Sequence, residues 1–170
     1  MAATVSLMTH NPPEGAPEHV SLADYLPYQL VVAANAVTRL VSRAYEDRFG
    51  LSIPQWRLMS VLAEGPLTQQ AAVVRTAMDK VRVSRAAQDL VERRLAVRLS
   101  NRVDRRSHSL ELTPAGRRLF AEIVPLARAY EAALLAGLAP SEVVTLKRLL
   151  GQLEAAAGTL YGADTAPDRL

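Results

Sequence analysis

The most constraining feature of the chain is a double change of hydrophobic spacing between Met78 and Phe120. Apolar residues recur at helical spacing along 80–94. They then alternate with polar residues on both sides of a polar loop at 101–107, and return to helical spacing after Thr113-Pro114. Helical spacing predicts an amphipathic helix, whereas alternation predicts strands. The segment therefore predicts a helix, a β-hairpin with a long loop, and a second helix.

Start and stop signals outside this segment predict further helices. Proline suits the first turn of a helix and glycine suits its end, and Ser21, Thr68, Asp79 and Thr113 are plausible N-caps. The predicted helices cover about 27–49, 55–63, 69–75, 80–94, 113–136 and 140–160, with a bend expected at Pro125. The predicted fold class is mainly α with a small β-hairpin wing: a winged helix-turn-helix flanked by long helices.

Positive charge is concentrated in the same part of the chain. Segment 66–112 contains ten basic and five acidic residues, a net charge of +5, whereas the whole chain carries +3. A solvated helical surface usually mixes the two signs more evenly. The distribution therefore favours a polyanionic partner such as double-stranded DNA.

The predicted helix 80–94 has two different faces. One sector holds the residues expected to pack on the core: Val83, Ala87, Leu90 and Val91. The opposite side holds Val81, Arg82, Arg85, Gln88, Asp89 and Glu92, with Lys80 and Ser84 at its flanks. Arginine can bond guanine edges, glutamine can bond adenine edges, and an exposed valine can contact a thymine methyl group. The alternative is an ordinary solvated helix surface.

The hairpin loop gathers further charge, because Arg102, Asp104, Arg105 and Arg106 lie within five positions. An aspartate can hold one guanidinium in a bidentate pair and so preorganise the loop. Another arginine is then free to enter a narrow minor groove, where the negative potential is strongest. The alternative is a solvated turn whose charges only keep the protein soluble.

The residue inventory argues against enzyme and metal chemistry. The chain has no cysteine, which excludes disulfides and cysteine-bound zinc, and its three histidines lack ligand spacing. No Gly-rich phosphate loop or Ser/His/Asp grouping is suggested. No apolar run reaches the roughly 18 residues of a membrane span, and the start lacks a secretory signal. We expect no metal, no cofactor, no membrane partner, no enzymatic activity, and a cytoplasmic location.

These residues together resemble the MarR family of bacterial transcription regulators over about 22–160. The motifs are Met78-Asp79-Lys80 leading into Val83-Ser84-Arg85, then Asp104-Arg105-Arg106-Ser107, then Leu112-Thr113-Pro114-Ala115-Gly116. The resemblance implies an obligate dimer with interlocking terminal helices, a recognition helix in the major groove and a wing at the minor groove. Two positions depart from it. Arg94 stands where a glycine usually ends the recognition helix, and Ala139 where a Thr or Ser cap is common.

The resemblance also implies which residues meet DNA. Bases and nearby phosphates would be contacted by Lys80, Val81, Arg82, Ser84, Arg85 and Gln88. Phosphates would be contacted from the start of the preceding helix by Thr68, Gln69 and Gln70. In the wing, Asp104 would pair with an arginine, most simply Arg106, which leaves Arg105 or Arg102 to reach the groove.

Similar proteins often bind small phenolic or aromatic acids between the dimer helices and the DNA-binding lobe. The candidate lining residues here are Tyr25, Tyr28, Tyr45, Trp56 and Tyr130, with Arg39, Arg43 or Arg57 as a carboxylate partner. Apolar walls with a few polar groups are what such a pocket needs. The alternative is that these aromatic residues pack in the core or at an interface.

The chain accordingly divides into five predicted parts. They are a flexible arm at 1–20, an N-terminal dimerisation helix at 21–50, a winged helix-turn-helix DNA-binding domain at 53–112, C-terminal dimerisation helices at 113–160, and a flexible tail at 161–170. The long amphipathic flanks favour a two-fold homodimer over an intramolecular bundle.

The function predicted from these observations is a dimeric, sequence-specific regulator that usually represses, binds a palindromic operator and is released by a small aromatic or phenolic ligand. The alternative is an architectural or non-specific DNA-binding protein without a ligand. A regulator should prefer its operator to random duplex by roughly 10³-fold or more, which separates the two classes.

Overall fold

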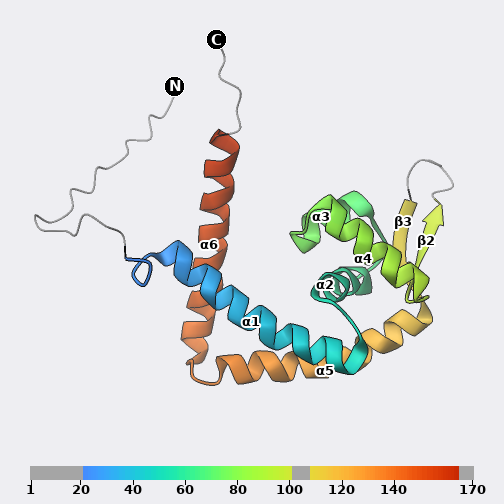
Figure 1. Ribbon diagram of the computed structural model, residues 1–170, viewed down its shortest axis with the longest axis horizontal. Coiled ribbons are helices and arrows are strands. Elements are labelled where there is room, and N and C mark those ends of the chain that lie inside the picture. Colours follow the sequence, from blue (N-terminus) through green and yellow to red (C-terminus); the bar gives the residue numbers. More distant parts are fainter. Residues whose placement is uncertain (1–20, 101–107, 165–170) are drawn as a thin grey trace, which may run out of the picture.

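The computed structural model describes residues 21–100 and 108–164 (Figure 1). Its elements are α1 (Leu26–Phe49), α2 (Ile53–Ala63), β1 (Leu67–Thr68), α3 (Gln69–Thr76), α4 (Lys80–Glu92), β2 (Ala96–Ser100), β3 (His108–Leu112), α5 (Pro114–Leu135) and α6 (Pro140–Asp164). This confirms the predicted fold class and the predicted order of helices and hairpin. Strand β1 was not predicted, because two residues are too few to show an alternating pattern.

Polar residues begin three of the helices as predicted. Thr68, Asp79 and Thr113 each accept a hydrogen bond from the backbone N–H three residues further on. Each bond satisfies one of the donors that a helix start leaves free. Gly50, at φ 60°, ends α1 in the left-handed conformation that glycine adopts without strain.

The bounds of several helices differ from the prediction, and α4, for example, ends at Glu92 instead of about Arg94. Tyr25, not Ser21, occupies the N-cap position of α1. Helix α2 begins before Gln55, because Ser52 and Gln55 form a capping box in which each side chain bonds the other residue's backbone. Helix α6 continues to Asp164, and so enters the range expected to be a tail.

The two departures from the family pattern have different local consequences. Arg94 has φ 57°, so the backbone after α4 takes the conformation that glycine favours despite the side chain. An L-residue there costs about 1–2 kcal/mol. At the start of α6, Ala139 offers no side-chain cap, but Glu142 accepts a hydrogen bond from the Ala139 N–H (2.7 Å). The exit of α4 is therefore strained, and the start of α6 keeps half of a capping box.

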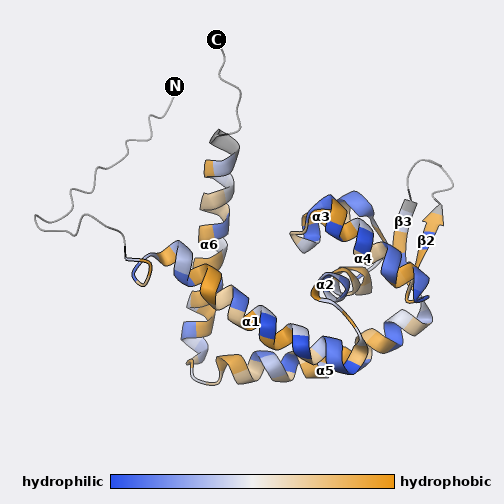
Figure 2. Cartoon of the chain, viewed as in Figure 1, coloured by the Kyte–Doolittle hydropathy of each residue, from blue (hydrophilic) through white to orange (hydrophobic). Residues whose placement is uncertain are grey.

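The elements form two parts in Figure 1. Helices α2, α3 and α4 gather with the sheet into a compact lobe, whereas α1, α5 and α6 extend away from it, and α5 changes direction along its length. The largest fully buried side chains are Leu51, Leu58, Met59, Leu62, Val83, Leu90 and Ile123. Most of them belong to the compact lobe, so the core sits there. Apolar residues follow the long helices as well (Figure 2), but many of these stay exposed.

The sheet has the antiparallel order β1-β3-β2. Ala96 pairs with Leu112 and Leu99 with Ser109, and residues paired in this way point to the same face. Leu112 is buried, whereas Leu99 is 39% exposed. Val97 and Leu99 of β2 therefore lie on the exposed face of the wing, whereas Leu110 and Leu112 of β3 face the core together with Ala96.

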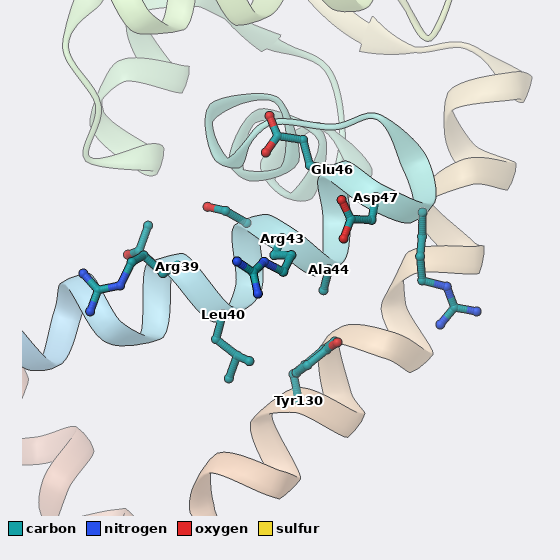
Figure 3. Close-up of a pocket in the computed structure, with 10 residues that line it drawn as sticks. Arg39, Leu40, Arg43, Ala44, Glu46, Asp47 and Tyr130 are labelled. Carbon is teal, nitrogen blue, oxygen red and sulfur yellow. The ribbon is translucent and has the colours of Figure 1, made fainter.

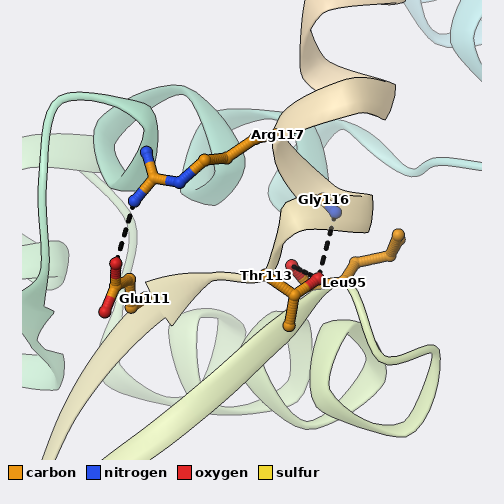
Figure 4. Close-up of polar contacts among 5 residues, drawn as sticks. All are labelled: Leu95, Glu111, Thr113, Gly116 and Arg117. Carbon is orange, nitrogen blue, oxygen red and sulfur yellow. Dashed lines mark hydrogen bonds and ion pairs between the residues drawn. The ribbon is translucent and has the colours of Figure 1, made fainter.

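Hydrogen bonds of Thr113 fix the start of α5 to the residues that follow α4 (Figure 4). The Thr113 N–H donates to the Leu95 carbonyl (3.0 Å) and its hydroxyl to the Arg94 carbonyl (2.7 Å). The Gly116 N–H donates in turn to the Thr113 hydroxyl (3.1 Å). A Cβ atom on Gly116 would lie 2.0 Å from the Leu95 carbonyl oxygen. The close approach of two backbones therefore requires glycine at this position.

Candidate nucleic-acid interface

Helix α4 presents the predicted polar face to solvent. Val83, Ala87 and Leu90 are buried, and so is Ala86, which the sequence pattern had not assigned to the core. The exposed residues on the other side include Lys80, Val81, Arg82, Arg85 and Gln88, and Ser84 is half-buried between the two faces. Val81 is 59% exposed. An exposed valine beside arginines is suited to contact the methyl group of a thymine base.

The polar side chains on this face differ in whether they are already bonded to another side chain. Arg82 Nε lies 3.2 Å from Asp79 Oδ2, so its guanidinium is held over the start of α4. The Gln88 amide donates to Glu92 Oε1 (2.9 Å). Lys80 and Arg85 form no side-chain hydrogen bond or ion pair with another described residue. These two cations can thus bind an anionic partner without first breaking a bond to another residue of 21–100 or 108–164.

Asp89 has a structural role on the same helix. Its carboxylate accepts a hydrogen bond from the Gln55 side chain on α2 (2.9 Å), although helical spacing grouped it with the outward residues. Gln55 is buried, which the sequence did not indicate. The α4 face offered to a partner is therefore narrower than the spacing predicted.

The remaining DNA-contact candidates lie at the start of α3 and in the wing. Thr68 is exposed, but its hydroxyl accepts from the Ala71 N–H (3.2 Å); Gln70 is exposed, and Gln69 is half-buried. Arg102, Asp104, Arg105 and Arg106 lie outside the described residues, so their predicted roles stay predictions. The described residues on either side of these positions are Ser100, which ends β2, and His108, which begins β3.

Three of the ligand candidates come together in one hollow of about 770 Å³ (Figure 3). Arg39 and Arg43 lie on α1, and Tyr130 reaches toward them from α5. Arg48, Glu46 and Asp47 also line this arginine hollow, and none of the three was among the candidates. Three arginines and two carboxylates give the hollow a net charge of +1, which suits a singly charged anion.

Tyr130 also lines a second, apolar hollow of about 450 Å³ between α1, α5 and α6. Tyr45 contributes to this apolar hollow, but its ring belongs to a cluster with Trp56, whose centroid lies 5.0 Å away. Trp56 in turn stacks on Phe120 at 5.3 Å. Burial raises the pKa of the Tyr45 hydroxyl, and the neighbouring Tyr130 raises it further, so Tyr45 stays neutral at physiological pH.

The other ligand candidates are not gathered there. Tyr25 and Tyr28 lie exposed at the beginning of α1, and Arg57 is exposed on α2; none of them lines the arginine hollow or the apolar hollow. Phe120, which stacks on Trp56, was not among the predicted ligand residues, because nothing in the local pattern distinguishes it from an ordinary core residue.

The described residues lack two other kinds of site. Across 21–100 and 108–164, no three His, Cys, Asp or Glu side chains lie close enough together to hold a metal ion. In the same part of the chain, none of the helices has the length and apolar content needed to cross a bilayer.

Comparison with known proteins agrees with this geometry. The sequence profile of the MarR family matches residues 49–107. A probable transcriptional regulator from Pseudomonas aeruginosa is 31% identical, covers 78% of this chain and 99% of its own, and has a TM-score of 0.70. A MarR/EmrR family transcriptional regulator from Acinetobacter sp. ADP1 is 26% identical over 82% of this chain and 99% of its own (TM-score 0.77). BpsR of Bordetella bronchiseptica is 27% identical over 81% and 97% (TM-score 0.74).

The winged helix-turn-helix, the outward cations of α4 and these similarities agree with one another. The chain belongs to the MarR family of DNA-binding transcriptional regulators.

Proposed function

We propose that the protein is a homodimeric repressor that binds a palindromic operator through its two α4 helices and leaves it when a small aromatic acid binds. The observation that carries the proposal is the outward face of α4, where Lys80 and Arg85 are unpaired among the described residues and Val81 stands 59% exposed. Such a regulator acts in the compartment that holds the DNA, the bacterial cytoplasm.

Exposed apolar residues on the long helices support the homodimer. They include Val31, Val32, Val37 and Leu40 on α1 and Leu146, Leu149, Leu150 and Leu153 on α6, each between 40% and 56% exposed. A soluble monomer rarely leaves so many large apolar side chains contiguous and uncovered. A two-fold partner would cover them and present two α4 helices to one side of a duplex, with half-sites about 34–36 Å apart.

We assign roles to the cations of α4 from the chemistry of each side chain and from the bonds it already forms. Arg85 suits a guanine edge, because a guanidinium can donate two parallel hydrogen bonds to it. Lys80, at the helix start, suits a phosphate. Arg82 already forms an ion pair with Asp79. We therefore assign to Arg82 the role of orienting the start of α4 on the DNA backbone, in preference to a base contact.

An Arg85→Ala variant is expected to bind the operator about 5- to 150-fold more weakly, equivalent to about 1–3 kcal/mol, and to lose preference at one base position. Selection of duplexes from a random pool gives the operator, and binding titrations then compare operator with random duplex. Arg118→Ala, which removes an exposed arginine from α5, is the charge-matched control. An equal loss on every sequence would assign Arg85 to the phosphates instead. A preference below about 10³-fold for the wild type would favour the architectural alternative.

The two hollows beside Tyr130 support an aromatic acid as the ligand. The apolar hollow offers an environment for a ring, and the arginine hollow offers guanidinium groups for a carboxylate. DNA binding by BpsR is regulated by 6-hydroxynicotinic acid, a molecule with both features. We therefore assign ring contact to Tyr130 and charge contact to Arg43.

An Arg43→Ala variant is expected to need about tenfold or more 6-hydroxynicotinic acid for release from the operator, because a charge-assisted hydrogen bond contributes about 1.5–3 kcal/mol. Release is followed by fluorescence anisotropy of a labelled operator. Arg128→Ala, on α5 and outside both hollows, serves as control. Equal sensitivity of the Arg43 variant and the wild type would remove the arginine hollow from the proposal.

A further inference from the structure

The end of α4 is bonded to the end of α1 by one side chain. Arg93 follows α4 directly, and its guanidinium donates to the carbonyl oxygens of Gly50 (2.8 Å) and Phe49 (3.0 Å). These carbonyls belong to the last turn of α1, where a helix has unsatisfied acceptors and the negative end of its dipole. A cation placed there makes charge-assisted bonds to main-chain atoms. Arg93 therefore connects the recognition helix to a predicted dimerisation helix.

A second bond reaches the same corner from α4. Asp89, one helical turn before Arg93, accepts from the buried Gln55 side chain (2.9 Å). The Gln55 side-chain oxygen accepts at the same time from the Ser52 N–H (2.9 Å), which fixes the orientation of the amide. The α1–α2 corner, residues 49–55, is thus held by Asp89 on α4 and by Arg93 directly after it.

Helix α5 is attached at nearly the same place. Thr113 bonds the carbonyl oxygens of Arg94 and Leu95, directly after Arg93. Both long helices that leave the compact lobe are therefore connected to it at residues 93–95. This junction directly follows the C-terminal end of α4, whereas Lys80 and Val81 lie in its first turn.

We propose that Arg93 is a positioning residue that sets the tilt of α4 relative to α1 and thereby the half-site spacing that the dimer accepts. Asp89 and Gln55 support it. Helix α4 is about 20 Å long, so a tilt of about 10° at its exit moves its first turn by roughly 3 Å, close to the rise of about 3.4 Å per base pair. Two symmetry-related helices double this change. The inference depends on the proposed binding of a two-half-site operator.

This role differs from a phosphate contact by Arg93 itself. Its guanidinium is already engaged by main-chain carbonyls, so Arg93→Ala should leave the slope of affinity against salt concentration unchanged. It should instead broaden the range of spacings that the dimer tolerates. A residue that only stabilised the fold would lower affinity for all spacings by the same factor.

The test measures binding of full-length Arg93→Ala to the selected operator and to versions with one base pair added or removed between half-sites. The wild type is expected to prefer its own spacing by about tenfold or more, and the variant by about threefold or less. Arg94→Ala removes an equal charge at the next residue, whose side chain has no partner among the described residues, and should retain the wild-type preference. Arg93→Lys should restore part of it.

The outcomes separate this inference from the proposed function. If the wild type binds no duplex specifically, the proposed function fails. If the wild type binds specifically but Arg93→Ala keeps the spacing preference, the positioning role is wrong and the proposed function stands. The same holds if Arg93→Ala changes only the slope of affinity against salt concentration. Should Arg93→Ala not fold, Asp89→Ala carries the test, since it removes one bond to the corner and leaves Gln55 bonded to Ser52; an unchanged spacing preference there overturns the proposal.

Discussion

A Gly116→Ala variant is expected to lose about 3 kcal/mol of unfolding free energy, which lowers the midpoint of thermal unfolding by roughly 6–12 °C. The added methyl group would lie 2.0 Å from the carbonyl oxygen and 3.0 Å from the carbonyl carbon of Leu95. Neither atom can move freely, because Thr113 bonds the same carbonyl and the start of α5. The variant must therefore separate α5 from the end of α4.

Thermal unfolding followed by circular dichroism checks this expectation. All samples are held at one protomer concentration, because association raises the apparent stability of any protein that dimerises. Gly158→Ala is the matched control: no atom lies within 4 Å of a Cβ added to this α6 glycine, so it should gain about 0.5–1 kcal/mol. If Gly116→Ala unfolds at or above the wild-type temperature, the contact between the two backbones is not a close constraint.

Replacing Leu149 with glutamate is expected to convert the proposed dimer to a monomer and to reduce operator affinity by about 100-fold or more. Leu149 is 44% exposed on the apolar side of α6 and lines a hollow between α6 and the beginning of α1. In a two-fold dimer this surface would be buried, and burying an unpaired carboxylate costs several kcal/mol. Symmetry places the charge on both sides of the interface.

Light scattering gives the molar mass, and a binding titration gives the loss of affinity. Ala155→Glu adds the same charge to the opposite side of α6, so it should remain dimeric and bind as the wild type does. Circular dichroism of Leu149→Glu should retain the helical signal of the compact lobe, whose core does not include α6. A Leu149→Glu protein that stays dimeric at micromolar concentration would place the interface elsewhere.

Most of the secondary structure could be predicted from the sequence because its signals are local. Thr68, Asp79 and Thr113 cap their helices through bonds to residues only three positions away. The outward side of α4 follows from helical spacing alone. The left-handed backbone at Arg94 could not be predicted from the local pattern, because an arginine does not favour that conformation.

The candidate ligand site could be predicted only in part. Composition and resemblance selected Arg39, Arg43 and Tyr130, which share the arginine hollow. They also selected Tyr25 and Tyr28, which lie at the far end of α1, because an aromatic residue has the same local pattern wherever its helix places it. Arg48 is one helical turn and a residue beyond Arg43, yet its place in the hollow depends on the crossing of α1 and α5.

The sequence alone determined the order of the elements, the caps and the charged face of α4, since each depends on residues near one another along the chain. Tertiary structure alone decided the contacts that join distant segments. Arg93 meets Gly50 across 43 positions, and Gln55 meets Asp89 across 34. No periodic pattern records such pairs. Whether an exposed arginine faces DNA or holds two helices together is settled only when the chain brings its partner within hydrogen-bonding distance.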